Sequence, residues 1–316
     1  MSHVNAQADS PGQSVRTPFR GRRQIQDRHI ALFFIMPTLI LLILINVFPL
    51  LYSLYLSFND YSVIANEPPK WVALDNFEKI LTTERSRYWH NFTVTGKYAV
   101  LSVGLQVVIG FTLAMLLRQK FKGSGLVTTL ILIPMMLSPV VVGLFWKLIF
   151  DPSKGIFNYL IYMEPTASGR EWLANPGLAL WAIVIVDVWM WSPFVMLLCL
   201  SGLSAIPDYL YEAAAIDRAS AWFQFRRITL PQVMPLLLIA VLFRTIEAFK
   251  AFDLVMGLTG GTPGDATETV AVRLYREAFL GKFKTGESSA LAYIVLIIII
   301  AVSNLYIRAL NRMKEA

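Results

Sequence analysis

The sequence has very little of the side-chain chemistry on which enzymes and metal sites depend. Among its 316 residues there is one cysteine, Cys199, so an intramolecular disulfide and a cysteine-based metal cluster are excluded. Its three histidines, His3, His29 and His90, fall in a polar tail or in a predicted loop. A histidine-based catalytic centre is therefore not expected. We predict that the chain is not an enzyme and that it binds no metal or cofactor itself.

Charged residues are also scarce, and the apolar residues stand in long blocks. Asp, Glu, Lys and Arg make up 16% of the chain and hydrophobic residues 56%, whereas soluble domains are about 25% charged. A helix needs about 20 apolar residues to cross a hydrocarbon layer of about 30 Å. Six segments meet this need: 30–59, 98–117, 123–146, 177–203, 232–257 and 288–307. They lack the two-residue alternation of barrel strands, so we expect helices.

The expected fold is an all-α integral membrane protein with six transmembrane helices. A polar, basic tail (1–29) precedes the membrane domain (30–310), and a short C-terminal end (311–316) follows it. The first apolar run is too long for a signal peptide and is expected to remain as an anchor. Basic residues in the tail and in the short loop 118–122 place both termini in the cytoplasm by the positive-inside rule. The net charge of +7 then reflects a cell-membrane (inner-membrane) protein in contact with lipid, and no nucleic-acid partner is expected.

The chain has no phosphate-binding loop of its own. No G-x-x-x-x-G-K-[ST] sequence occurs, and Gly281-Lys282 is followed by Phe283. If transport is driven by ATP, hydrolysis must take place on another polypeptide.

A patterned loop (204–231) lies between the fourth and fifth predicted helices. Pro207 and Asp208 favour a helix start, and residues 208–216 favour a helix that ends near Asp217. Along this helix, Leu210, Ala213, Ala214 and Asp217 are predicted to fall on one side. So short a helix is marginal alone and needs a packing partner. The alternative is an amphipathic helix on the membrane surface, but such helices usually present Lys or Arg beside a broad apolar face.

Several stretches resemble one family of membrane proteins. The run EAAAIDRASAWFQFRRITLPQVMP (212–235) resembles the EAA loop of binding-protein-dependent ABC importer permeases. The run FRTIEAFKAFDLVMGLTGGTPGDATET (243–269), VALDNF (72–77) and the kinked, proline-containing LIPMMLSPVVVGLFW (132–146) resemble the carbohydrate-uptake, maltose-type branch. The resemblance covers most of residues 30–310.

The resemblance implies a permease subunit of an ATP-driven importer that moves a sugar or related carbohydrate into the cell. It implies a second permease subunit in a heterodimer, two ATPase subunits that bind ATP and magnesium, and an extracytoplasmic solute-binding protein. In this family the EAA loop forms a coupling helix that inserts into a cleft of the ATPase. The residues expected to couple to the ATPase are Glu212, Ala213, Ala214, Asp217, Arg218, Leu230 and Pro231.

One residue of the loop departs from the family pattern. Arg218 stands where the family usually has a glycine. That glycine suits a left-handed turn, which disfavours other residues by about 1–2 kcal/mol. We therefore expect either strain at Arg218 or a different turn.

Charges inside the predicted membrane spans mark a candidate translocation path. Arg244, Glu247, Lys250 and Asp253 recur at three-residue intervals along the fifth predicted helix, where opposite charges can pair. Counted along the helices, Arg244 lies about 18 Å from the inner end and Asp187 about 15 Å from the outer end, so the two can pair. The residues expected to line the path are Asp187, Trp191, Arg244 and Glu247. Structural pairing or snorkelling is the alternative interpretation.

Two other functions fit a polytopic membrane protein. A stand-alone secondary transporter or channel predicts inverted repeats or paired broken helices, and no repeat is detectable in the sequence. A membrane enzyme needs clustered catalytic side chains at one membrane face, and the sequence shows none.

Overall fold

The computed structural model describes residues 25–65, 67–83, 85–119, 121–162, 171–281 and 283–315. Most of the predicted tail, with His3, lies outside these residues. The chain divides into two compact units, Met1–Tyr52 and Ser53–Ala316, and each is described by itself.

The first unit is helical wherever it is described. It contains α1 (Ile25–Leu42), the π-helix η1 (Ile43–Val47) and the start of α2 (Phe48–Ser57). The N–H of Phe48 bonds to the carbonyl of Ile43, five residues back, directly before Pro49. Proline lacks an N–H and its ring clashes with the carbonyl four residues back, so a wider turn accommodates it. The helical stretch Leu32–Ser57 is long and apolar enough to cross a membrane, as predicted for the first helix.

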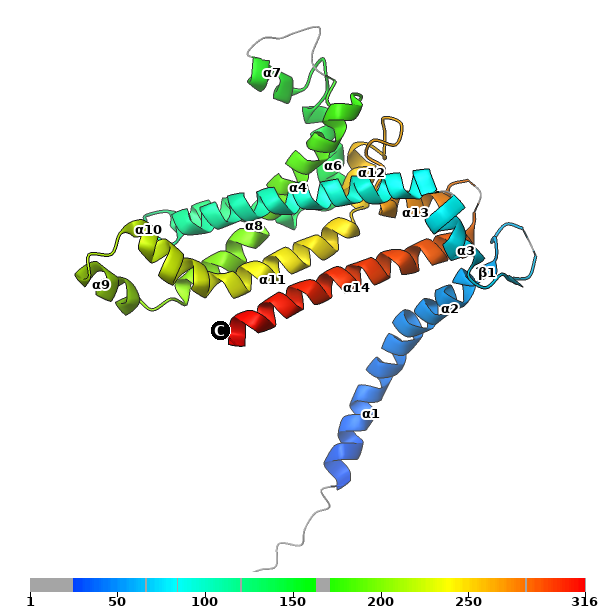
Figure 1. Cartoon of the computed structure of the whole chain (residues 1–316), viewed down its shortest axis with the longest axis horizontal. Coiled ribbons are helices and arrows are strands. Elements are labelled where there is room, and N and C mark those ends of the chain that lie inside the picture. Colours follow the sequence, from blue (N-terminus) through cyan, green and yellow to red (C-terminus); the bar gives the residue numbers. More distant parts are fainter. Residues whose placement is uncertain are drawn as a thin grey trace, which may run out of the picture. The chain divides into compact units, whose positions relative to one another are not determined.

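Four long helices lie side by side in the second unit (Figure 1). They are α4 (Arg85–Leu117), α8 (Pro176–Ser204), α11 (Leu230–Phe249) and α14 (Thr285–Glu315). The most extensive contact joins α4 to α8, and α11 packs against α4, α8 and α14. Close approach of α4 to α8 depends on Gly110, where an added Cβ atom would lie 2.7 Å from the carbonyl oxygen of Ser192. His90 lies on α4 and not in a loop as predicted, because α4 extends well before residue 98.

The third predicted helix is broken rather than kinked. It consists of α5 (Ser124–Leu132), the 3-10 helix η3 (Ile133–Met136) and α6 (Pro139–Ile149), and the two arms meet at 99°. Leu137 and Ser138 between them are extended. Ser138 is extended because the residue before a proline is forced out of the helical region. Among the described residues there are therefore five helices able to cross a membrane, or six if the bent pair counts as one span.

The fifth predicted helix, 232–257, has different ends in the structure. The helical stretch begins at Ala221, because α10 (Ala221–Gln224) and the π-helix η4 (Phe225–Thr229) continue into α11. It stops at Phe249, and a separate α12 (Asp253–Leu258) follows. Asp253 thus does not lie on the spanning helix α11, and Lys250 is the C-cap of α11. The α12 helix packs against α6, where Gly143 and Gly257 bring the two backbones together.

The connecting segments contain more structure than the sequence predicts. They hold the strands β1 (Asn59–Asp60) and β2 (Lys70–Trp71), and the helices α3 (Asp75–Glu78), η2 (Lys79–Thr83), α7 (Ile156–Tyr162) and α13 (Val270–Phe279). The two short strands pair antiparallel and are an exception to the all-α prediction. The side-chain amide of Asn76 donates to the carbonyls of Ser57 and Asn59 and thereby ties α3 to β1.

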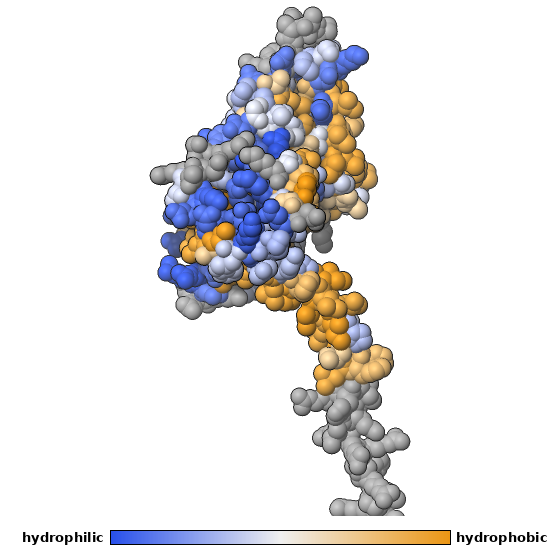
Figure 2. All heavy atoms as spheres, turned by 90° about the vertical axis from the view of Figure 1, so that its right-hand side faces the viewer, coloured by the Kyte–Doolittle hydropathy of each residue, from blue (hydrophilic) through white to orange (hydrophobic). Residues whose placement is uncertain are grey.

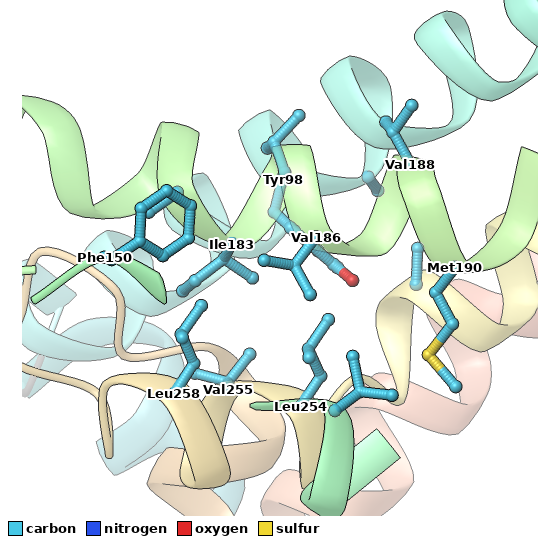
Figure 3. Packing of buried hydrophobic residues seen from close by; sticks show 14 of the residues in the cluster. Tyr98, Phe150, Ile183, Val186, Val188, Met190, Leu254, Val255 and Leu258 are labelled. Carbon is cyan, nitrogen blue, oxygen red and sulfur yellow. The ribbon is translucent and has the colours of Figure 1, made fainter. Parts of the chain in front are cut away.

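The main hydrophobic core lies where α4, α6, α8 and α12 meet (Figure 3). Tyr98 of α4 reaches into it beside Ile183 and Val186 of α8, and Val255 and Leu258 of α12 complete it. A second cluster, which includes Met196, Leu203 and Val233, joins α4, α8 and α11. Both clusters pack α8 against α4.

The α4–α8 contact makes a testable prediction. We expect Gly110→Ala to destabilise the folded protein by about 1–3 kcal/mol, because its Cβ atom would meet backbone of α8 and overpack the contact. The matched control is Gly104→Ala on the same helix, where no atom lies within 4 Å of an added Cβ atom. That variant should be neutral or slightly stabilising. Equal unfolding midpoints of the two variants in detergent would contradict the close helix contact.

Candidate functional site

The patterned loop contains a short helix where the sequence predicts one. The helix α9 (Tyr209–Ile216) begins directly after Pro207 and Asp208. The carbonyl of Pro207 accepts from the N–H of Leu210, and that of Asp208 accepts from the N–H of Tyr211. The predicted helix 208–216 is therefore confirmed to within one residue.

Arg218 adopts the left-handed conformation that the resemblance assigns to a glycine. Its φ is +53°. The N–H of Arg218 bonds to the carbonyl of Ala215 at 3.1 Å, and the N–H of Ala219 bonds to the carbonyl of Ala214 at 2.8 Å. This pair of bonds is the Schellman motif, which satisfies carbonyls at a helix end. The turn is thus the expected one, and Arg218 carries the strain of it.

The side of α9 predicted to carry Leu210, Ala213, Ala214 and Asp217 faces a hollow of about 550 Å³. Its lining includes Leu210, Ala213, Ala214 and Asp217, together with Phe223 and Ile228 from the following helical stretch. Glu212 and Arg218 are exposed, Leu230 is half-buried and Pro231 is exposed in the first turn of α11. The hollow confirms that the four predicted residues share one side of the helix.

Large apolar side chains near α9 are also exposed. Ile216 is 82% exposed and Trp222 is 68% exposed, and Tyr209 and Phe223 are exposed beside them. Apolar surface gathered at one place in this way is typical of a protein interface. These residues were not predicted as site residues, although apolar side chains in a polar loop are a signal present in the sequence.

Tyr211 anchors α9 to two other elements, a role that the sequence does not reveal. Its hydroxyl lies 2.8 Å from the hydroxyl of Thr229, which is buried in η4. The guanidinium of Arg118, just after α4, lies 4.1 Å from the centre of the Tyr211 ring. A partly buried hydrogen bond therefore connects α9 to the helical stretch that ends in α11, and a cation–π contact connects it to the end of α4.

A buried polar cluster joins α4, α8 and α11. Nη2 of Arg244 lies 3.3 Å from Oδ1 of Asp187, and its Nε donates to Oε1 of Gln106 at 2.9 Å. The amide of Gln106 in turn donates to Oδ2 of Asp187 at 2.8 Å. Asp187 and Arg244 are each 3% exposed. The predicted pairing of Asp187 with Arg244 is confirmed, and Gln106 is a third member that was not predicted from the sequence.

The other two candidate path residues lie beside this cluster. The guanidinium of Arg244 lies 4.5 Å from the centre of the Trp191 ring. Glu247 is exposed and pairs with Lys250 at 2.7 Å, as its spacing predicts. A small hollow of about 100 Å³ is lined by Asp187, Trp191, Arg244 and Glu247, with Lys250 and Asp253 at the same place. The structure thus brings the four residues together.

Side chains that could hold a metal ion do not gather in the part of the chain that the structure describes. There, no group of three or more His, Cys, Asp and Glu side chains is placed to hold a metal ion. His90 lies 3.6 Å from a carboxylate oxygen of Asp265, which is a surface pair.

Comparison with known proteins identifies the family. Residues 106–315 match the family model described as "Binding-protein-dependent transport system inner membrane component". The chain belongs to this family of ABC importer permeases and is a multi-pass protein of the inner membrane. It is a membrane subunit of a transport system.

Relatives and solved structures agree with this assignment. The chain is 34% identical over 275 residues to the trehalose/maltose transport system permease protein MalF of Thermococcus litoralis. The aligned residues cover 87% of this chain and 91% of the relative. It is 36% identical over 288 residues to a probable ABC transporter permease, y4oQ, of Sinorhizobium fredii, with 90% of each chain covered. The resemblance to the importer permeases and to their maltose-type branch is confirmed. A chain of a bacterial alginate importer has the same fold, with a TM-score of 0.78 at 18% identity over 91% of this chain and 97% of that one.

The buried cluster generates the second prediction. We expect Arg244→Ala to destabilise the protein by about 3–5 kcal/mol, because it leaves the Asp187 carboxylate buried without its cation. Replacing both charges, as in Asp187→Asn with Arg244→Gln, should recover part of this loss. The control is Lys250→Ala, which removes an exposed pair and should change stability by less than about 1 kcal/mol. Unfolding midpoints and uptake should be measured together. Strictly additive effects of Asp187→Asn and Arg244→Gln in the double variant would argue against the pair.

Proposed function

We propose that this chain is one of two permease subunits of an ATP-driven importer that moves a sugar or related carbohydrate into the cell. A sister permease completes the pathway, two ATPase subunits bind ATP and magnesium, and a solute-binding protein delivers the substrate from outside. Both termini and the loop 204–231 lie in the cytoplasm. The name of the trehalose/maltose relative supports the substrate class. The observation that carries the proposal is α9, a helix that exposes Glu212 while Tyr211 fixes it to the membrane helices.

In this proposal α9 acts as the coupling helix. An ATPase cleft receives Glu212, Ala213 and the apolar side chains that surround them. When ATP closes the ATPase pair, it displaces α9. Tyr211 passes this displacement to Thr229 in η4, and the helical stretch from Ala221 to Phe249 carries it onward to Arg244. Rigid, contiguous elements of this kind are a physical route for coupling between distant sites.

The substrate path lies beside the buried polar cluster. Asp187, Gln106 and Arg244 satisfy one another and are almost fully buried, so their main contribution is to fix the helices. Glu247 and Lys250 are exposed at the same hollow and can exchange their mutual hydrogen bond for sugar hydroxyls. Trp191 provides an adjacent apolar wall. The alternative, a stand-alone secondary transporter, predicts paired broken helices. The described residues contain one bent pair, so no observation favours that function.

Charge reversal on α9 tests the coupling role. We expect Glu212→Lys to abolish ATP-driven uptake while the protein still inserts into the membrane and assembles with its sister permease. The control is Glu78→Lys, which reverses another exposed helical carboxylate in a segment proposed to face the outside. Uptake should be measured in proteoliposomes that contain the complete transporter. Normal transport by the Glu212 variant would be incompatible with the proposed docking of α9.

Removal of one hydroxyl tests the anchoring role of Tyr211. We expect Tyr211→Phe to leave the ATPase subunits bound but to lower the amount of substrate moved per ATP hydrolysed, because α9 loses its bond to Thr229. A net loss of about 1 kcal/mol is typical for one such hydrogen bond, which corresponds to roughly fivefold in an equilibrium. The control is Tyr209→Phe, on the same helix but with an exposed side chain. If both variants keep the wild-type ratio of uptake to hydrolysis, Tyr211 does not transmit motion.

A further inference from the structure

Arg218, which closes the turn after α9, has a backbone conformation that is unfavourable for an arginine. Its φ of +53° lies in the left-handed region, which glycine enters freely and which crowds the Cβ atom of other residues. The bonds that the N–H groups of Arg218 and Ala219 make to α9 hold this turn in place. Strained residues of this kind gather at functional sites. The strain therefore raises the question of what the arginine side chain contributes.

The isolated chain gives the guanidinium of Arg218 little to bind. The residue is exposed, and within the part of the chain that the structure describes it makes no ion pair, side-chain hydrogen bond or cation–π contact. The dipole of α9 favours a basic residue at this end, but that effect is weak at an exposed position and does not require an arginine. A guanidinium has five N–H donors and no acceptor, so its best partner is a carboxylate or a phosphate.

The surroundings of Arg218 favour a protein carboxylate over a phospholipid. Ile216, two residues earlier, is 82% exposed, and Trp222, four residues later, is 68% exposed. Arginine and tryptophan are enriched among the residues that contribute most to protein–protein binding. The same helix and its two ends also expose three acidic side chains that would repel an anionic lipid surface: Asp208, Glu212 and Asp217.

We propose that Arg218 determines which ATPase this permease accepts, because its guanidinium binds a carboxylate of the matching ATPase in a bidentate pair beside α9. This inference rests on the proposed function, in which α9 enters a cleft of the ATPase. An ATPase with a carboxylate at the facing position gains a charge-assisted pair. An ATPase without one leaves the guanidinium desolvated and unpaired. One residue thus favours the correct partner and disfavours others.

The proposal gives Arg218 opposite effects on the free permease and on the complex. In the free permease, glycine at this position would be more stable, because it lacks the crowded Cβ atom. In the complex, glycine would lose the pair with the carboxylate. Residues kept for function at the expense of stability have this property. An arginine that is merely tolerated would show the first effect without the second.

The test measures stability and ATPase affinity on the same samples, with the permease pair in nanodiscs and the ATPase whose gene neighbours that of this permease. We expect Arg218→Gly to raise the unfolding midpoint by about 2–4 °C and to weaken ATPase binding by about tenfold. The salt dependence of binding should also decrease. Arg218→Lys keeps the charge but loses the bidentate geometry, so we expect binding about threefold weaker than in the wild type.

Two further variants separate the charge from the backbone. Asparagine enters the left-handed region more easily than arginine, so Arg218→Asn removes the charge without the flexibility of glycine. It should weaken binding as much as Arg218→Gly. Ala73, two residues before α3, has a φ of +50°. The α3 helix lies at the end of the second unit opposite α9 (Figure 1), and Figure 2 looks onto that end, where much of the surface is hydrophilic. Ala73→Gly should therefore raise the midpoint and leave ATPase binding unchanged.

Charge reversal identifies the partner group. Arg218→Glu should block uptake, and selection for restored uptake should yield ATPases in which an Asp or a Glu has become Lys or Arg. Uptake that persists in this variant would contradict the pair.

Equal ATPase affinity of the wild-type and Arg218→Gly permeases would overturn the inference, whatever their stabilities. So would normal binding by Arg218→Asn beside weak binding by Arg218→Gly, because flexibility of the turn would then control docking. In both cases the wild-type permease still binds the ATPase, and the proposed function stands. If the ATPase does not bind the wild-type permease pair, the proposed function fails, and this inference fails with it.

Discussion

The arrangement of the membrane helices depends on the need to neutralise Arg244. A guanidinium inside a bilayer is strongly unfavourable unless its charge and its donors are satisfied. Asp187 supplies the opposite charge from α8, and Gln106 supplies an acceptor from α4 while it also donates to Asp187. These bonds are satisfied together only at one relative rotation and height of the three helices. The cluster therefore fixes α4, α8 and α11 in register, where apolar packing alone would tolerate sliding.

The helical stretch that carries Arg244 also connects this cluster to the end of the second unit where α9 lies. The stretch from Ala221 to Phe249 is helical throughout and includes η4, which Leu230 separates from Pro231. Thr229 lies in that π-turn and bonds Tyr211 of α9. A proline normally weakens a helix, yet here the wider turn accommodates it and also places the Thr229 hydroxyl against α9. The short helix, which is marginal alone, is thereby held against the membrane helices.

The end of the second unit that carries α13 is organised differently. There the chain leaves α11 at Phe249, forms α12 against α6, and returns through α13 to α14. Ion pairs between Arg276 and Glu268 and between Lys284 and Glu287 hold this segment, and Asn91 and Thr95 of α4 bond to its backbone. At one end of the unit, a tyrosine and a threonine join α9 to the membrane helices. At the other end, charged side chains hold the segment around α13.

The sequence alone determined the features that depend on local pattern. Hydropathy located five of the spans, α9 followed from its start and stop signals, and helical spacing placed Asp187 and Arg244 at similar depth. It did not determine the 99° break between α5 and α6, the separation of α12 from α11, the helix α13, or the roles of Gln106 and Tyr211. The roles of Gln106 and Tyr211 depend on contacts between different elements: Gln106 and Arg244 are separated by 138 positions, and Tyr211 and Thr229 by 18. Local propensity predicts where a segment is helical, whereas only the packed structure decides which side chain meets which, because that choice depends on the rotation and depth of each helix against its neighbours.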